Sequence, residues 1–266
     1  MTEPMMNVRY MGWSGVEVEY AGETLLIDYI EDGSSIFQDG AFVQPLGPGT
    51  AAAAIVTHLH ADHADPVALK RALGVDAPVF RPEPTQGSRA IRSWTAPVEE
   101  RFRETKLLTH VAQPWTERQV GPFRLLAVPA VDGLGDPQLT WIVEAGGIRI
   151  LHAGDTMNHG YWWAIAQFAG TIDVAFLPIN GPVIQLPHLQ PPSPFAAVLN
   201  PEEAAVAGHI LGAGLVVPIH YGDINMPPVY VETQNPVTRF REQSEALGVS
   251  SMTAVPGEWF AAGGRT

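Results

Sequence analysis

Four side chains of metal-binding type stand within six positions of this 266-residue sequence, namely His58, His60, Asp62 and His63. Residues two apart on an extended strand point to the same side, so we expect His58 and His60 to face one ion together. Asp62 and His63 follow where the chain is expected to turn, and they bring two more donors to the same place. One tetrahedral ion would not take four donors from so short a segment, which predicts two metal ions sharing it.

These donors need a rigid support, and the apolar run directly before them, Ala51–Val56, predicts a buried strand. Apolar patterning predicts further strands at Val8–Tyr10, Val16–Tyr20, Thr24–Ile27, Leu107–Val111, Phe123–Val128, Trp141–Glu144, Ile148–His152, Val174–Pro178, Leu215–Ile219 and Ser251–Val255. Helix start and stop residues predict helices at Pro66–Leu73, Gln86–Trp94, Tyr161–Phe168, Pro201–Leu211 and Pro236–Leu247. Since no linker divides the chain, we expect two sheets packed face to face with helices outside, in one domain spanning residues 1–266.

The charge and composition exclude several classes of function. Lys and Arg number 15 against 28 Asp and Glu, a net charge of −13 that disfavours nucleic acid as a partner. The chain contains no cysteine, which excludes disulfides, thiolate ligands and a cysteine nucleophile. We see no leader peptide and no apolar run of membrane-spanning length, and therefore predict a cytoplasmic protein without membrane contact. The expected partner is a small-molecule substrate, and the sequence leaves a homo-oligomer open.

The segment from His58 to His63, placed after an apolar strand, resembles the H-x-H-x-D-H motif of the metallo-β-lactamase superfamily of metal-dependent hydrolases. Three further segments resemble that family in the same order, and they are Leu25–Asp28, His152–Thr156 and Val217–Tyr221. Two more resemble the branch that contains L-ascorbate-6-phosphate lactonase, and they are Phe176–Gly181 and Asn200–Ala204. The resemblance implies an α/β (α+β) fold, a four-layer αββα sandwich of two mixed β-sheets flanked by helices.

The resemblance also implies a ligand set. One ion would be held by His58, His60 and Asp132, and the other by Asp62, His63 and His220, with Asp155 bridging the two. The family usually has histidine where this chain has Asp132, in Val128–Gly133. A carboxylate there is still a good ligand, and it makes a centre with one bridging hydroxide neutral and favours Mn²⁺ or Fe²⁺ over Zn²⁺.

Other residues have supporting roles in this interpretation. Asp28 and His152 are expected to hydrogen-bond the ligands from behind. The candidates for substrate contact are Asn180, His159, His188 and Tyr221. If Asp132 is instead a solvated turn residue, His110, His159 or His188 would stand in for it, or one metal would be missing.

The leading functional hypothesis is a dinuclear hydrolase with two divalent ions, Zn²⁺ or Mn²⁺, with Fe²⁺ as a third candidate. A metal-bridging hydroxide would attack a small lactone, ester, amide or phosphoester, with Asp62 and Asp155 as the catalytic carboxylates. Lysine occurs only at positions 70 and 106, which favours lactones or amides over phosphoesters. The alternatives are a mononuclear non-heme iron oxygenase on the same fold and a catalytically silent metal- or ligand-binding member.

Overall fold

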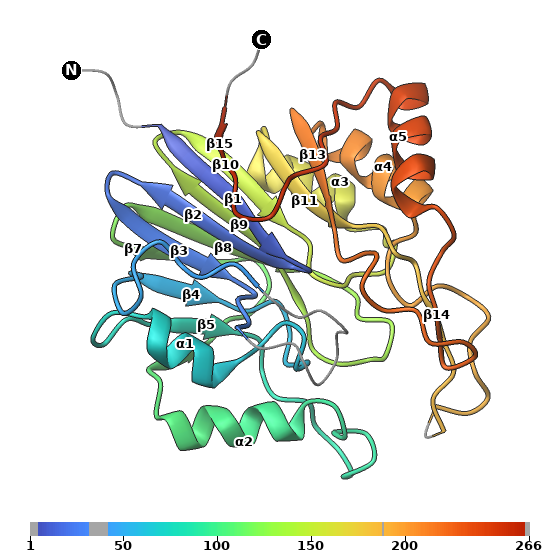
Figure 1. Ribbon diagram of the computed structural model, residues 1–266, viewed down its shortest axis with the longest axis horizontal. Coiled ribbons are helices and arrows are strands. Elements are labelled where there is room, and N and C mark those ends of the chain that lie inside the picture. The colour runs from blue at the N-terminus through green and yellow to red at the C-terminus, as the bar shows by residue number, and fades with distance from the viewer. Residues whose placement is uncertain (1–4, 32–41, 188, 264–266) are drawn as a thin grey trace.

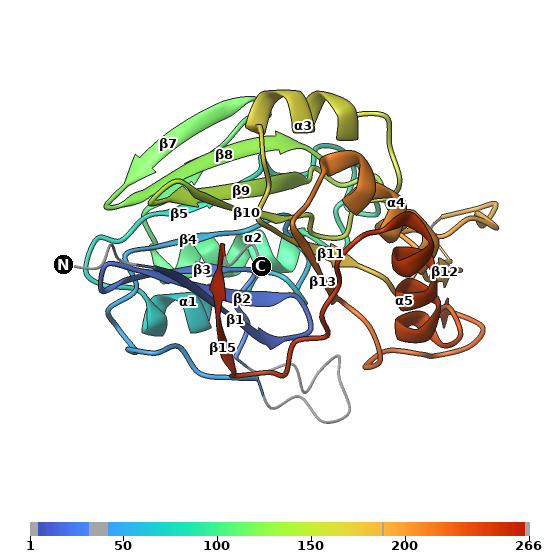
Figure 2. The same cartoon turned by 90° about the horizontal axis from the view of Figure 1, so that it is seen from above.

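The computed structural model describes residues 5–31, 42–187 and 189–263, which form two mixed sheets stacked face to face (Figures 1 and 2). The first sheet has the order β15 (Trp259–Ala262), β1 (Met6–Gly12), β2 (Gly15–Tyr20), β3 (Glu23–Ile27), β4 (Ala53–Ile55), β5 (Val79–Arg81) and β6 (Thr109–Val111). The second has the order β13 (Leu215–Ile219), β11 (Val174–Pro178), β10 (Ile148–His152), β9 (Leu139–Ala145), β8 (Phe123–Pro129) and β7 (Thr116–Val120). A two-stranded ribbon pairs β12 (Val183–Ile184) with β14 (Tyr230–Val231).

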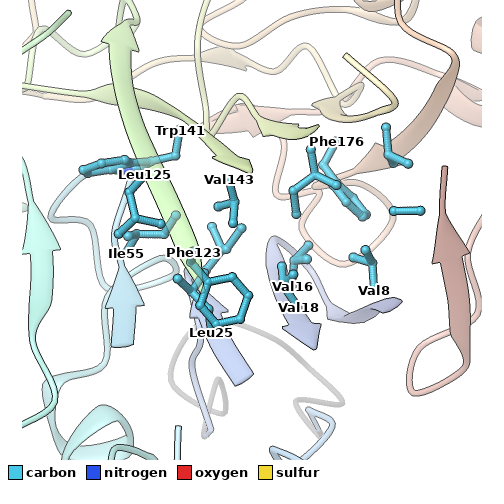
Figure 3. Close-up of a cluster of buried hydrophobic side chains, with 14 of the residues drawn as sticks. Val8, Val16, Val18, Leu25, Ile55, Phe123, Leu125, Trp141, Val143 and Phe176 are labelled. Atoms are coloured by element: carbon cyan, nitrogen blue, oxygen red, sulfur yellow. The ribbon is translucent and has the colours of Figure 1, made fainter. Parts of the chain in front are cut away.

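The core between the sheets follows from the alternation of side chains along the strands (Figure 3). In β3, Leu25 and Ile27 enter this inner core, whereas Leu26 faces the opposite side. In β8, Phe123 and Leu125 likewise point inward. All these side chains are buried, so each sheet presents one apolar face to its neighbour and a second apolar face to the outside.

Helices cover both outer faces and complete the four layers that the sequence predicted. The helices α1 (Pro66–Ala72) and α2 (Ala96–Thr105) pack on the first sheet. The second sheet is covered by α3 (Trp162–Ala169), α4 (Pro201–Leu211) and α5 (Pro236–Leu247). Figure 2 shows α1 and α3 on opposite sides of the paired sheets. None of the helices within the described ranges is long and apolar enough to cross a membrane.

Two sequence-predicted elements are wrong. Gln86–Trp94 forms turns, because Gly87 has a φ of +119° that no α-helix contains, and the helix begins only at Ala96. Ser251–Val255 makes a single bridge, between Ser251 and Val216, and the last strand is β15. The helix α2 and the strands β5, β7, β12, β14 and β15 went unpredicted. Among these strands, β5, β12 and β14 have only two or three residues, and β7 is almost entirely polar.

The strands β3, β4, β5 and β6 run parallel, as do β10, β11 and β13. At their carboxyl ends the two sheets are tied together: Leu139 N–H donates to Thr57 O (2.9 Å), and Trp141 Nε1 donates to Val56 O (3.0 Å). The carboxyl ends of parallel strands are where α/β proteins place their sites. This end of the sandwich therefore supports the functional side chains.

Candidate metal centre

Loops that leave both sheets at this end carry the predicted donors. The loop after β4 carries His58, His60, Asp62 and His63, whereas Asp132, Asp155 and His220 follow β8, β10 and β13 of the second sheet. The loops of Asp132 and Asp155 are joined by a β-bridge between Asp132 and Thr156. Residues 162 positions apart in the sequence, from 58 to 220, thus meet at one point.

One group of donors consists of His58, His60 and Asp132, each with a ligand atom within 4.8 Å of the others. Nε2 of His58 and Nδ1 of His60 lie 3.0 Å apart. Burial lowers the pKa of His58 well below its usual value, and the neighbouring His63 and His60 lower it further. A neutral imidazole is the form of histidine that binds a metal ion.

A second group consists of Asp62, His63, Asp155 and His220. Nε2 of His63 and Nε2 of His220 each lie 3.0 Å from Asp155 Oδ1. The other oxygen of Asp155, Oδ2, lies 4.0 Å from Nε2 of His58 in the first group. Asp155 therefore stands between the two groups, with one carboxylate oxygen toward each.

The charges of this second group compensate one another. Burial alone would raise the pKa of Asp155, but His220 and His63 outweigh burial and hold this pKa well below its usual value. Burial likewise would lower the pKa of His63, but the carboxylates of Asp155, Asp62 and Asp28 raise it well above its usual value. The carboxylates of this group therefore favour positive charge between them, and a bound cation would supply that charge.

Both groups fit divalent cations. His63 Nε2, His220 Nε2 and Asp155 Oδ1 are buried and contact one another as ion pairs at 3.0 Å, but within the described part of the chain none of the three has a partner with hydrogen-bond geometry. Converging imidazole nitrogens and carboxylate oxygens without hydrogen-bond partners are costly unless an ion binds them. Four histidines and three carboxylates suit Zn²⁺, Mn²⁺ and Fe²⁺, and the carboxylates favour the last two.

Asp28 lies behind the second group, as the sequence predicted. Its Oδ1 accepts from Thr57 N–H (2.7 Å), and its Oδ2 contacts Thr57 Oγ1 (2.6 Å) and His63 Nδ1 (2.7 Å). The bond to Nδ1 fixes the His63 ring with Nε2 toward Asp155. His152 is also buried behind the site, where its Nε2 donates to Ser14 O at 2.8 Å and its Nδ1 lies 4.0 Å from Asp28 Oδ2.

Asp136 has the corresponding position behind the first group, and sequence reasoning missed it. Its Oδ2 lies 2.8 Å from Nε2 of His60, and its Oδ1 accepts from Thr85 Oγ1 at 2.5 Å. Both Asp136 and Thr85 are buried. This contact turns Nδ1 of His60 toward His58. The available signal was the turn Asp132–Asp136, which has an aspartate at each end.

Asp132 is held in place by hydrogen bonds and is half-buried. Its Oδ1 accepts from the backbone N–H groups of Leu134 (2.7 Å) and Asp136 (3.1 Å). The Gln138 amide, oriented with its oxygen toward Asp155 N–H (3.0 Å), donates to Asp132 Oδ2 at 3.3 Å. Burial is the largest influence on the Asp132 carboxyl, and it raises the pKa above the usual value.

Trp13 is a further residue that the sequence gave no reason to select. Its Nε1 donates to Asp62 Oδ2 (3.1 Å), and its carbonyl accepts from His220 N–H (2.8 Å). Its ring contacts the ring of that histidine in a tilted arrangement, with 3.8 Å between the ring centroids. Trp13, Asp28 and His220 all have φ between +46° and +57°, a region unfavourable for residues other than glycine. Such conformations cluster at functional sites. Here they place Trp13 and Asp28 in contact with the donors Asp62 and His63.

A cavity of about 270 Å³ opens beside the donors and reaches His60, Asp62, Asp132, Asp155 and His220. Most of the remaining wall is apolar, and Tyr230 of β14 contributes a hydroxyl group. Asn180 Nδ2 donates to Tyr230 Oη at 2.6 Å. Burial raises the pKa of Tyr230 well above its usual value, and Asp155 and Asp62 add to this effect, so Tyr230 keeps its proton.

The predicted substrate residues lie mostly away from this wall. Asn180 is fully buried and reaches the cavity through Tyr230. Tyr221 packs against the outer core beneath α4 and α5, and His159 stacks on Trp162 at 4.1 Å, so neither lines the cavity. His188 lies outside the described residues.

Comparisons with known proteins agree with this geometry. A family model described as Beta-lactamase superfamily domain matches residues 23–221. A UPF0173 metal-dependent hydrolase of Thermus thermophilus is 29% identical over 262 residues, which cover 96% of this chain and 98% of the relative. A metallo hydrolase structure from Ignicoccus hospitalis has a TM-score of 0.66 at 19% identity, covering 97% of this chain and 98% of the other.

A further similar structure is CmlA, a diiron β-hydroxylase from Streptomyces venezuelae, with a TM-score of 0.74 at 16% identity. This match covers 98% of the present chain but 54% of CmlA. At such identities the two solved structures show the fold alone, whereas the family match covers most of the chain and all seven donors. The chain therefore belongs to the metallo-β-lactamase superfamily.

Proposed function

We propose that this chain is a dinuclear hydrolase that binds two divalent cations and cleaves a small carbonyl or phosphoryl compound. The observation that carries the proposal is the place of Asp155, whose Oδ1 lies 3.0 Å from His63 and His220 and whose Oδ2 lies 4.0 Å from His58. A carboxylate with one oxygen toward each of two donor groups has the arrangement of a bridging ligand. The first group would be His58, His60 and Asp132, and the second Asp62, His63 and His220.

When bound, the two cations supply a hydroxide nucleophile near neutral pH and polarise the oxygen of the attacked group. The chain's own residues position the reactants. Asp62, which His63 and His220 keep ionised against the effect of burial, accepts a hydrogen bond from the attacking water and orients it. Trp13 Nε1 holds the Asp62 carboxylate in place. Because Asn180 donates to Tyr230 Oη, the hydroxyl hydrogen of Tyr230 remains for an oxygen atom of the substrate.

The finer assignments rest on sequence and composition. The segments Phe176–Gly181 and Asn200–Ala204 support lactone chemistry, as in the branch of L-ascorbate-6-phosphate lactonase. Met6 and Ala262 belong to the same core between the sheets, although they are far apart in the sequence. This shared core supports one domain over residues 1–266. The location proposed from the sequence is cytoplasmic, and the absence of cysteine is compatible with it because the fold needs no oxidising compartment.

Metal content and hydrolysis test the proposal together. Protein saturated with Mn²⁺ or Zn²⁺ should contain close to two ions per chain by elemental analysis and should hydrolyse at least one class in a panel of lactones, esters, amides and phosphodiesters. Asp155→Asn should hold at most one ion and lose roughly a hundredfold or more in kcat/KM. Asp76→Asn is the matched control, because Asp76 is exposed and does not line the cavity.

An iron oxygenase is the second candidate, and the carboxylate-rich donor set favours it because such ligands suit Fe²⁺. Metal stoichiometry distinguishes the two candidates, because a mononuclear oxygenase would bind one iron per chain and consume dioxygen in the presence of a reductant. One ion per chain at saturation, with oxygen uptake and no hydrolysis, would replace the hydrolase by this alternative. Two ions with neither activity would instead indicate a catalytically silent binding protein.

A further inference from the structure

The cavity beside the donor groups has an apolar wall that the proposed chemistry does not require. Six aliphatic side chains form much of it, and they are Leu134, Ile184, Leu186, Ile224, Met226 and Val229. They come from separate loops after β8, around β12 and after β13. Met226 and Val229 are 55% and 44% exposed, whereas Ile224 is 7% exposed, so the apolar surface runs from the rim into the interior. Such a wall binds the apolar part of a small molecule.

The charges around the cavity are of one sign. Among the described residues that line it, none is lysine or arginine. Five carboxylates lie in or directly behind the donor groups, and they are Asp28, Asp62, Asp132, Asp136 and Asp155. Together they outweigh the charge of two divalent cations. A phosphate or carboxylate on the substrate would find no cation of the protein to bind and would be repelled.

We propose that this cavity selects uncharged carbonyl substrates with an apolar tail, such as esters or lactones of short to medium chain length, and disfavours phosphorylated or otherwise anionic ones. The substrate class rests on the proposed hydrolase function. The tail lies against the aliphatic wall, and the carbonyl group lies at the donor end near Tyr230. A methylene group moved from water to an apolar wall strengthens binding about fourfold, until the tail outgrows the cavity.

Ester kinetics test the selection directly. For the metal-loaded protein, kcat/KM should rise about fourfold per methylene from p-nitrophenyl acetate to the hexanoate and then level off. Mono-p-nitrophenyl glutarate, an anionic counterpart of the hexanoate, should react roughly tenfold or more slowly. Rates that do not depend on chain length, or a preference for the anionic ester, would overturn the proposal while leaving the hydrolase function intact.

A charge variant locates the effect in this cavity. Met226→Lys adds a positive charge at the exposed rim of the cavity. At about 10 mM ionic strength it should reduce the ratio of kcat/KM for the hexanoate ester to kcat/KM for the glutarate ester roughly threefold, and this change should disappear near 1 M salt. The control is Val75→Lys, because Val75 is 95% exposed and does not line the cavity. An equal change in both variants would contradict the assignment of the selection to this wall.

Binding of unreactive ketones separates this proposal from the proposed function. Calorimetry should give affinities that rise from 2-butanone to 2-octanone and fall for 6-oxoheptanoate, which carries a carboxylate at its far end. This result without hydrolysis of any class in the panel of lactones, esters, amides and phosphodiesters would support the cavity assignment and overturn the hydrolase function. Equal affinities for all the ketones would overturn the cavity assignment.

Discussion

Asp136→Asn should weaken metal binding at one of the two donor groups and leave the other unchanged. The Asp136 carboxylate contacts both Nε2 of His60 (2.8 Å) and Oγ1 of Thr85 (2.5 Å). An asparagine of the same size keeps one acceptor oxygen for His60 Nε2 and places an amide NH₂ group toward Thr85 Oγ1, which must then accept instead of donate; the negative charge is lost. The His60 ring thereby exchanges a charged partner for a neutral and weaker one, and the orientation of its Nδ1 toward His58 is held less firmly.

The expected magnitude follows from what partners of metal-binding histidines contribute. Their removal costs tenfold to a hundredfold in metal affinity, or about 1.4 to 2.8 kcal/mol. Stepwise binding constants for Mn²⁺ and Zn²⁺, measured by competition with a chromophoric chelator, should show this loss for one ion only. Asp28→Asn is the matched variant for the other group, because Asp28 contacts Nδ1 of His63.

The two variants should therefore affect different binding steps. A loss shared equally by both ions in Asp136→Asn would show that the groups do not bind independently. A loss of a whole ion would show that Asp136 is itself a ligand. Unchanged affinities would refute the positioning role. Asp76→Asn, with an exposed side chain far from the donors in the fold, controls for the general effect of one fewer negative charge.

Four further predictions concern the same centre. Asp155→Ala should lower metal content more than Asp132→Ala does, since it removes donors from both groups, and equal losses by elemental analysis would contradict the bridging assignment. Asp132→His should shift the metal preference toward Zn²⁺ and raise the affinity for an anionic inhibitor at low salt. If Mn²⁺ and Zn²⁺ compete for the variant as they do for the wild type, Asp132 is not a metal ligand. Gly133→Ala should lower kcat/KM roughly tenfold or more, because a Cβ at this position would lie 2.1 Å from the backbone oxygen of Ala197 and would have to displace that part of the cavity wall. Wild-type kinetics would show that the Ala197 segment moves without any cost to catalysis. Tyr230→Phe should lower kcat about tenfold to a thousandfold with little change in metal content, whereas a lower metal content would indicate a structural role.

Most of the fold could be predicted because the strands that form its core have local patterns. Phe123–Val128 alternates between the two faces of its sheet, and Pro201–Leu211 begins with an Asn200 capping box that the structure confirms. The strand β7, Thr116–Val120, could not be found this way. It is a polar edge strand whose existence depends on pairing with β8, not on burial of its own side chains.

The donors of the candidate centre were accessible to sequence reasoning for a different reason, since four of them share one short segment. The supporting residues were not, because they act across long separations in the chain. Asp136 meets His60 over 76 positions, and Tyr230 meets Asn180 over 50. No local pattern marks such a pair. The apolar cavity wall was equally hidden, since its side chains come from separate loops.

The bonds that tie the two sheets together at their carboxyl ends have a consequence for folding. Thr57 and Val56 of the first sheet accept hydrogen bonds from Leu139 and Trp141 of the second, directly beside the donors. A cation bound by donors from both sheets is a cross-link at the same seam, and it exists only in the native state. At a free metal concentration of a thousand times Kd, each such ion adds about 4.1 kcal/mol to the free energy of unfolding. With the proposed ions bound, the supply of metal would therefore set the free energy that holds the two sheets together at this seam.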